Sequence, residues 1–229
     1  MVAALVALSL LPNLVELPPA SVQVQHAGGR DILRFSSTAA NAGPGALVVL
    51  STRRGASAPF ATSQLVDSAR VALPLELRYR RSGGHDHFHL AGFERYELRD
   101  RNGKVLVSDR KVGFCLGDRM ALRGAAARPR FTGSCARGDP GALRVLQGIS
   151  PGYADPYDAE LDGQSLDVTG LPAGEYVLVN EVNPDRLLRE TRYDDDAASV
   201  RFRLTRPPAP AGLAFVTVLA TCRSDSCPR

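Results

Sequence analysis

The chain has 229 residues, of which 44% are hydrophobic and 23% are charged. This composition is ordinary for a folded globular protein and too apolar for a disordered one, and the length predicts a single domain. The net charge of +4 comes from arginines spread along the chain, without a block of basic residues or a basic helix. Nucleic-acid binding is therefore not indicated, because binding along a phosphate backbone needs basic residues gathered on one face.

The first residues resemble part of a secretory signal peptide. Residues 1–10 are almost entirely apolar, but they are too short to span a bilayer. The positively charged start of a signal peptide is missing, so we interpret them as a partial signal-peptide-like segment. No later segment reaches the roughly 20 apolar residues of a membrane helix. We therefore expect a secreted, extracellular protein without a transmembrane span.

The four cysteines are an even number, as is typical of proteins from an oxidising compartment. The sequence-local pairings are Cys115 with Cys135 and Cys222 with Cys227, although three connectivities are open. A bond between Cys115 and Cys135 would close a loop of about 20 residues and brace the segment that carries Lys111. The alternative is a set of free, buried thiols in a cytosolic protein.

Short apolar and alternating runs predict an all-β fold. Arg101-Asn102-Gly103-Lys104 has the turn chemistry of a two-residue hairpin between two of these runs. No stretch keeps a helical period over three turns, and residues 120–145 have the composition of a long loop. We expect a β-sandwich-like core with long loops and little helix. The predicted strands cover residues 47–50, 71–79, 93–98, 105–107, 176–179, 200–204 and 215–219.

Three of the four histidines lie in one short segment, GHDHFH, as His85, His87 and His89. In an extended strand, residues two apart point to the same face and lie about 6.6 Å apart, so the three imidazoles would project together. Imidazole ligands suit copper, zinc, iron or nickel, and copper binds nitrogen sites most strongly among these metals. The outer two Cα atoms would be about 13 Å apart in a flat strand, so we expect a bulge or twist to close the site. The alternative is an exposed polar strand without a ligand, and we interpret the isolated His26 as a surface residue.

The histidine segment and two later segments resemble the lysyl oxidase family. Residues 84–100 resemble its copper-binding segment, and residues 111–116 (KVGFCL) resemble the segment with its cofactor lysine. Residues 148–164 (GISPGYADPYDAELDGQ) resemble the segment with its cofactor tyrosine. The three occur in the family's order, and the similarity extends over roughly residues 11–204. The resemblance implies that residues 11–229 form a lysyl oxidase-like catalytic domain in which His85, His87 and His89 bind copper.

The resemblance also implies a cofactor made from the chain itself. Lys111 and Tyr157 fall on the precursors of the family's quinone, lysyl tyrosylquinone. Tyr153 is the competing tyrosine, but the spacing to the flanking family residues matches Tyr157. Asp155 falls on a family aspartate and is the candidate base that removes the substrate proton.

The implied function is that of a copper-dependent amine oxidase. A primary amine, which includes peptidyl lysine, would react with water and O2 to give an aldehyde, ammonia and hydrogen peroxide. Acidic residues near Tyr157, such as Asp155, Asp158 and Glu160, would favour cationic substrates locally. The chain departs from animal members of the family in having only four cysteines and no tryptophan.

A second ion site is indicated by residues 190–196 (ETRYDDD). Glu190, Asp195 and Asp196 fall on ligand positions of a calcium-binding segment in some lysyl oxidase-like proteins, with Asn13-Leu14 nearby. Carboxylate oxygens are the ligands that calcium prefers. Arg192 stands where those relatives carry an acid, and the alternative is a solvated acidic turn.

Two other functions remain open at this point. A metal-binding protein without oxidase activity would keep the histidines but leave Lys111 too far from Tyr157 to react. An adhesion-type β-sandwich module would need neither feature, and the segments at Asn41-Ala-Gly43 and Asn183-Pro184 resemble such bacterial domains.

Overall fold

The computed structural model describes residues 10–81, 85–109, 112–125, 128–208 and 212–228. Lys111 and all but the last residue of the signal-peptide-like segment 1–10 lie outside the described residues. Within them the chain forms eighteen strands and no helix, which confirms the all-β prediction, and no membrane-spanning helix is present there. The strands are β1 (Leu14–Glu16), β2 (Ala20–Ala27), β3 (Arg30–Asn41), β4 (Leu47–Thr52), β5 (Ala61–Val66), β6 (Ala69–Leu73), β7 (Leu77–Arg80), β8 (His87–Ala91), β9 (Glu94–Arg99), β10 (Val105–Asp109), β11 (Val112–Phe114), β12 (Met120–Ala121), β13 (Arg144–Ile149), β14 (Tyr153–Tyr157), β15 (Ser165–Asp167), β16 (Gly174–Val182), β17 (Ala197–Thr205) and β18 (Phe215–Cys222).

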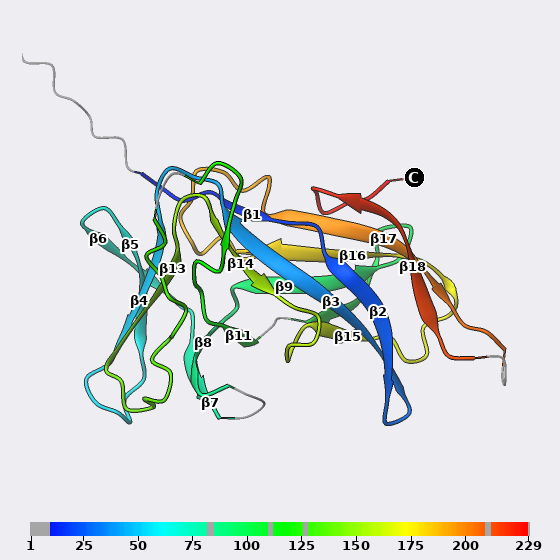
Figure 1. The fold of residues 1–229 in the computed structure, drawn as a ribbon, viewed down its shortest axis with the longest axis horizontal. Coiled ribbons are helices and arrows are strands. Elements are labelled where there is room, and N and C mark those ends of the chain that lie inside the picture. Colours follow the sequence, from blue (N-terminus) through cyan, green and yellow to red (C-terminus); the bar gives the residue numbers. More distant parts are fainter. Residues whose placement is uncertain (1–9, 82–84, 110–111, 126–127, 209–211, 229) are drawn as a thin grey trace, which may run out of the picture.

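The strands pair into antiparallel sheets organised around the 12-residue strand β3. In the largest sheet β3 lies between β1 and β14, β14 also pairs with β12, and β2 and β15 pair with β3 as well. A second sheet has the order β10-β9-β16-β17-β18. Two smaller sheets have the orders β11-β8-β7 and β13-β4-β5-β6 and lie together on the left of Figure 1.

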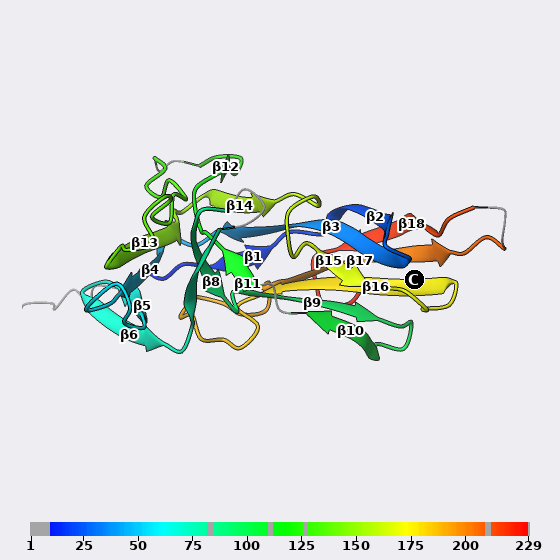
Figure 2. The same ribbon diagram turned by 90° about the horizontal axis from the view of Figure 1, so that it is seen from below.

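The two large sheets pack face to face as a sandwich, and they appear as two layers in Figure 2. Phe35 of β3 meets Tyr96 of β9 edge to face, with ring centroids 4.9 Å apart. Leu178 of β16 and Val200 of β17 are fully buried in the same core. Burying an aliphatic side chain of this size contributes roughly 1.5–3 kcal/mol. The predicted β-sandwich-like core is thereby confirmed.

Two local predictions differ from the structure. The predicted strand 71–79 is two strands in different sheets, because Pro74, between β6 and β7, has no N–H to donate to a ladder. The hairpin between β9 and β10 is present, but its loop is longer than two residues. The N–H of Asp100 donates to the carbonyl of Lys104 at 2.9 Å, which leaves three residues in the loop. The Asp100 carboxylate accepts the N–H groups of Asn102 and Lys104 at 2.8 and 3.0 Å and holds this wider turn.

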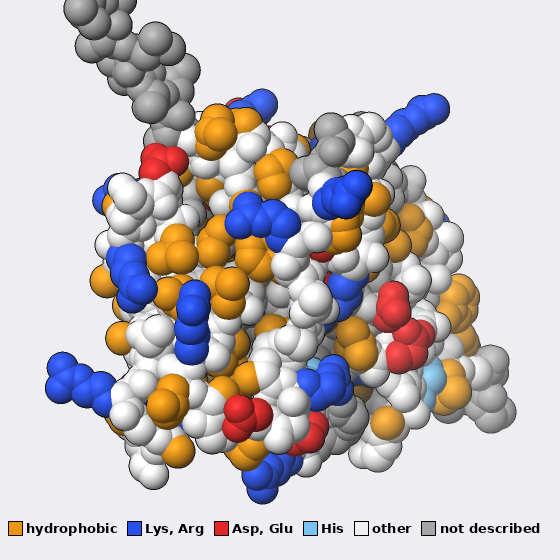
Figure 3. Space-filling model, turned by 60° about the vertical axis from the view of Figure 1, so that its left-hand side comes forward, with side chains coloured by type: hydrophobic (Ala, Val, Ile, Leu, Met, Phe, Trp, Pro, Cys, Tyr) orange, Lys and Arg blue, Asp and Glu red, His pale blue; other side chains and the backbone are white. Residues whose placement is uncertain are grey.

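Both sequence-local disulfides are present, Cys115–Cys135 and Cys222–Cys227, and the alternative of free thiols is therefore wrong. Between residues 120 and 145 the described chain is irregular apart from the two-residue strand β12 and the start of β13, as the long-loop prediction expects. On the face shown in Figure 3, basic side chains stand singly among hydrophobic ones and do not form a continuous stripe.

Candidate metal and cofactor site

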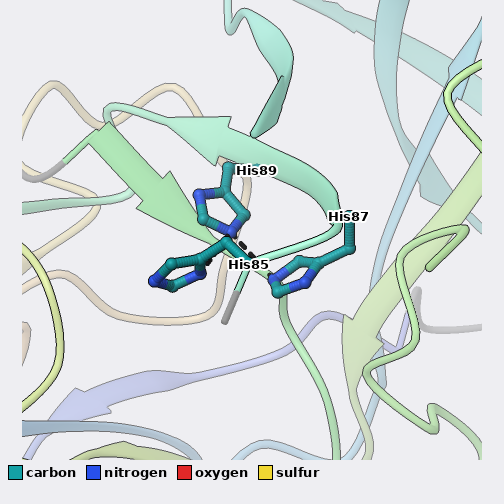
Figure 4. A group of neighbouring side chains, drawn as sticks. All are labelled: His85, His87 and His89. Carbon is teal, nitrogen blue, oxygen red and sulfur yellow. Dashed lines mark hydrogen bonds between the residues drawn. The ribbon is translucent and has the colours of Figure 1, made fainter. Parts of the chain in front are cut away.

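The three histidines converge on one point (Figure 4). His87 and His89 belong to β8, where residues two apart share a face, and His85 precedes the strand. Nε2 of His89 lies 2.8 Å from Nε2 of His87 and 3.2 Å from Nδ1 of His85. The three rings come together because the chain leaves strand geometry before His87. A bulge or twist within the row of histidines was expected instead. Among the described residues, this is the group of possible metal ligands whose atoms all lie within 4.8 Å of one another.

The spacing of these nitrogens fits a single metal ion. Two nitrogens bound to one ion at about 2.0 Å and at right angles to each other lie about 2.8 Å apart. A single proton on Nε2 of His89 cannot bridge both neighbouring nitrogens, whereas one ion can bind all three. His87 and His89 are 7% and 3% exposed, so the rings are held in a fixed arrangement. The donor set suits a first-row transition metal, copper included.

The electrostatic surroundings keep His87 in the metal-binding form. Burial, together with the positive charge of Arg137 and the neighbouring His85, lowers the pKa of His87 to about 4. A neutral imidazole is the form that binds a metal, because a proton would occupy the lone pair.

Strand β11 packs so closely on the histidines that only glycine fits at its centre. β11 pairs with β8 with a register shift between Val112 and Phe114, and Gly113 lies at this irregularity. A Cβ at Gly113 would lie 2.7 Å from Nδ1 of His89, and its φ of +152° is one that side chains rarely adopt. The Lys111 segment therefore leads into a strand that directly supports a predicted copper ligand.

Tyr157 stands at the end of β14 with its ring in the core. Its side chain is 8% exposed, and Phe114 packs edge to face against it with ring centroids 4.8 Å apart. The N–H of Cys115 donates a hydrogen bond to the phenolic oxygen at 2.9 Å. Burial raises the pKa of Tyr157, and the positive charge of Arg119 and the Cys115 N–H oppose that rise.

The histidines and Tyr157 share one pocket of about 450 Å³. Tyr153, the competing tyrosine, does not line it. Its lining combines the three imidazoles and the Tyr157 ring with two arginines and two aspartates. The lining residues are His85, His87, His89, Gly113, Cys115, Arg119, Arg137, Pro156, Tyr157, Asp158, Leu161 and Asp162.

The acidic residues near Tyr157 fall into different environments. Asp155 is fully buried, forms an ion pair with Arg119 and does not line the pocket. Asp158 and Asp162 do line it, whereas Glu160, on the same turn, does not. Proximity in the sequence therefore identified Asp158 but missed Asp162.

Arg119 was not singled out from the sequence, because no spacing rule marks it. Its place follows from the pairing of β12 with β14, which brings residue 119 opposite Asp155. A two-residue strand inside a long loop leaves no periodic pattern that would have found this contact.

The predicted calcium residues lie together, at the junction of the opening segment and the start of β17. Glu190 accepts the N–H of Leu14 at 2.7 Å, and Asn13 donates to the Asp195 carboxylate at 2.9 Å. Glu190 and Asp196 are each 5% exposed, so these two do not belong to a solvated turn. Burial and repulsion from neighbouring carboxylates raise the pKa of Glu190 to about 7 and that of Asp196 to about 8.

These carboxylates do not converge as tightly as the histidines. The Oδ1 atoms of Asp195 and Asp196 are buried without a hydrogen-bond partner in the described structure. Arg192 pairs with Asp194 at 2.8 Å and lies 3.8 Å from Asp195, so it neutralises part of the turn. Calcium binding by Glu190, Asp195 and Asp196 stays a prediction.

Fold and site together define an all-β protein with a three-histidine metal-type site beside a buried tyrosine. A family model described as "Lysyl oxidase" matches residues 73–209. The match covers more than half of the chain, and the chain belongs to the lysyl oxidase family.

Individual relatives carry names from the same family. The chain is 32% identical over 123 residues to protein-lysine 6-oxidase from Sus scrofa, a match that covers 53% of this chain and 45% of that protein. It is equally similar to the Homo sapiens protein-lysine 6-oxidase, of which the match covers 27%. Lysyl oxidase homolog 1 from Homo sapiens is 30% identical over 123 residues, which is 53% of this chain and 20% of that protein. The chain thus spans less than half the length of these relatives.

Proposed function

We propose that this protein is a secreted, copper-dependent amine oxidase that converts primary amines, including peptidyl lysine, to aldehydes with O2. Family membership supports an oxidoreductase in general. The observation that carries the finer proposal is the single pocket shared by the three histidines and the buried Tyr157. The two disulfides support folding in an oxidising, extracellular environment.

His85, His87 and His89 would hold copper, and Lys111 and Tyr157 would form lysyl tyrosylquinone. When bound, copper and the quinone would supply the oxidation of a primary amine by O2, with water as the hydrolysing reactant, to give aldehyde, ammonia and hydrogen peroxide. Lys111 lies outside the described residues, so its approach to Tyr157 is part of the proposal.

The chain's own residues would bind the amine and accept its proton. Asp158 and Asp162, which line the pocket and are exposed, would attract a cationic substrate. Asp155, the base implied by the family resemblance, would first have to release Arg119, because the ion pair occupies its carboxylate. A substrate deuterated at the carbon next to nitrogen tests this role: an Asp155→Asn variant should slow the step that shows an isotope effect.

The decisive experiment is peptide mass spectrometry on protein matured with copper in air. A covalent link between the peptides that contain Lys111 and Tyr157 is expected, and it should be absent without copper. Tyr157→Phe should remove the link while copper binding persists, and the matched Tyr153→Phe variant should keep both. A copper-loaded, folded wild-type protein without the link would contradict the proposal and leave metal binding without oxidase activity.

A further inference from the structure

Arg119 is fixed beside Tyr157 by contacts from several parts of the chain. It forms an ion pair with the Asp155 carboxylate, and its Nη2 donates to the carbonyl of Cys115 at 2.8 Å. The central carbon of its guanidinium lies 5.6 Å from the centre of the Tyr157 ring, within the range of a cation–ring interaction. Its side chain is 36% exposed, so one side faces the pocket.

The register of β12 on β14 places Arg119 beside Asp155. Met120 pairs with Ala154 across β12 and β14, and the N–H of Arg119 donates to the carbonyl of Ala154 at 3.2 Å. Arg119 therefore stands opposite Asp155, one residue further along. Asp155 is 0% exposed, and a buried carboxylate is costly to leave without its cation. Asp155 thus holds the guanidinium in place.

The loop at Gly133 packs closely against the guanidinium of Arg119. Gly133 has a φ of +63°, and a Cβ there would lie 2.8 Å from Nη2 of Arg119. The other oxygen of Asp155 accepts the N–H of Gly117 at 3.3 Å, so the anchor is itself fixed. The guanidinium therefore has a close neighbour in this loop in addition to its partner Asp155.

The charges around the Tyr157 phenol differ in sign and in distance. Arg119 is the strongest influence that lowers its pKa against burial, followed by the Cys115 N–H, and Glu94 acts in the opposite direction. Asp158, Asp162 and Arg137 line the same pocket and are exposed, and Arg119 is exposed in part as well. The three histidines line the same pocket and would carry the copper charge when it is bound. Among the residues that the structure describes, Arg119 is thus a cation held close to the ring by its ion pair with Asp155.

We propose that Arg119 favours the ionised form of the Tyr157 phenol, and that Asp155 is the positioning residue that holds Arg119 there. The phenolic proton would leave to solvent in the pocket. The purpose of this ionisation rests on the proposed function, because a phenolate gives up an electron more readily than a phenol and Tyr157 is the ring to be oxidised. A preorganised charge of this kind needs no rearrangement at the moment of reaction.

The test measures the acidity of Tyr157 directly in metal-free protein, before any quinone exists. The chain is labelled with 3-fluorotyrosine, whose phenol is more acidic than that of tyrosine and therefore titrates before alkaline unfolding. Six tyrosines give at most six fluorine NMR signals, and Tyr157→Phe identifies the relevant one. Removing the cation in Arg119→Gln should weaken the acidity of Tyr157 by roughly tenfold or more, and Arg119→Lys should restore part of it.

Two further variants keep the result decisive if Arg119→Gln does not fold. Asp155→Asn should weaken the acidity in the same direction, and combining it with Arg119→Gln should add little, because both act through one contact. Arg137→Gln removes a cation from the same pocket and should leave Tyr157 unchanged. An unaltered Tyr157 ionisation in folded Arg119→Gln or Asp155→Asn, or an equal effect of Arg137→Gln, would overturn the proposal. Because no copper is present, this result is independent of whether Lys111 and Tyr157 ever become linked.

Discussion

The backbone N–H of Cys115 donates a hydrogen bond to the phenolic oxygen of Tyr157, 2.9 Å away. Its disulfide partner, Cys135, accepts the N–H of Phe88 at 3.0 Å, and Phe88 lies between His87 and His89. One covalent bond therefore joins a contact to the candidate cofactor tyrosine with a contact to the candidate metal strand. The disulfide holds the two parts of the site at a fixed separation although they belong to different sheets.

Removing the Cys115–Cys135 disulfide should lower the stability of the fold and loosen the arrangement of the site. Replacing Cys115 and Cys135 together with serine opens a loop with a sequence separation of 20. The free energy of unfolding should fall by about 3 kcal/mol on the chain-entropy model, as measured by urea denaturation. The Lys111–Tyr157 link should also form in lower yield. The control is the Cys222 and Cys227 pair, with a separation of 5, whose loss should cost about 2 kcal/mol and leave the link unaffected.

His87→Ala should remove copper binding, because it takes away a buried ligand from the middle of the row. Isothermal titration calorimetry with copper and metal analysis of the dialysed protein would both report this. The matched control is His26→Ala, since His26 lies outside the cluster and bonds to Asp31 and to the carbonyl of Ala214 at 2.6 and 2.9 Å. Copper retained at one ion per chain in His87→Ala would contradict the assignment.

Asp158→Asn and Asp162→Asn should weaken the binding of cationic amines. Both carboxylates line the pocket, so their loss should raise KM several-fold with little change in kcat. The effect should shrink as salt is added, because screening reduces attraction between exposed charges. Glu160→Gln, on the same turn but outside the pocket lining, should change nothing. Equal effects of all three variants would point to overall charge and not to the pocket.

Stability should fall as the pH rises, because of the buried carboxylates at the second cluster. The pKa values of Glu190 and Asp196 are raised to about 7 and about 8 in the folded chain. Unfolded values are about 4, so the folded state binds more protons than the unfolded state between about pH 4 and 8. The free energy of unfolding should therefore decrease across that range and level off above it. Urea denaturation at several pH values measures it, and Glu190→Gln with Asp196→Asn should flatten the curve.

Calcium should reverse this loss if the predicted site binds it. An ion that binds only the folded, ionised carboxylates stabilises the protein in proportion to the logarithm of its concentration. The gain should appear at pH 8 and be small at pH 5, where Glu190 and Asp196 are protonated. Magnesium at the same concentration is the control, because it requires a tighter octahedral arrangement. No response to calcium at pH 8 would remove Glu190, Asp195 and Asp196 from the list of ion ligands.

The sequence was sufficient for features that depend on local patterns. Alternating strands and the row of histidines were predicted because each follows from residue type and spacing, whereas the two disulfides present are the sequence-local pairings among three connectivities that stayed open. The prediction of a single strand over residues 71–79 was wrong, because the apolar pattern runs through Pro74 while the chain changes sheets there. The contact between Arg119 and Asp155 could not be predicted, because it depends on the register of a two-residue strand.

The site itself was predictable only through resemblance. No spacing rule brings Tyr157 to the histidines, which lie about 70 residues away in the sequence and in another sheet. Their common pocket is a product of how the two sheets pack, and that information is spread over many residues. The close approach of Gly113 to His89 is likewise a tertiary contact, and nothing in the sequence distinguishes this glycine from the other glycines among the 21.

The position of the Cys115–Cys135 bond also sets an order of events during maturation. The disulfide joins the residue that contacts Tyr157, Cys115, to the residue that contacts the histidine strand, Cys135, so it should help to align the two contacts. Thiol oxidation should therefore come first, and self-processing of the tyrosine should follow. On the proposed function, a newly made chain kept under reducing conditions would carry every reactive group and yet form the Lys111–Tyr157 link in lower yield.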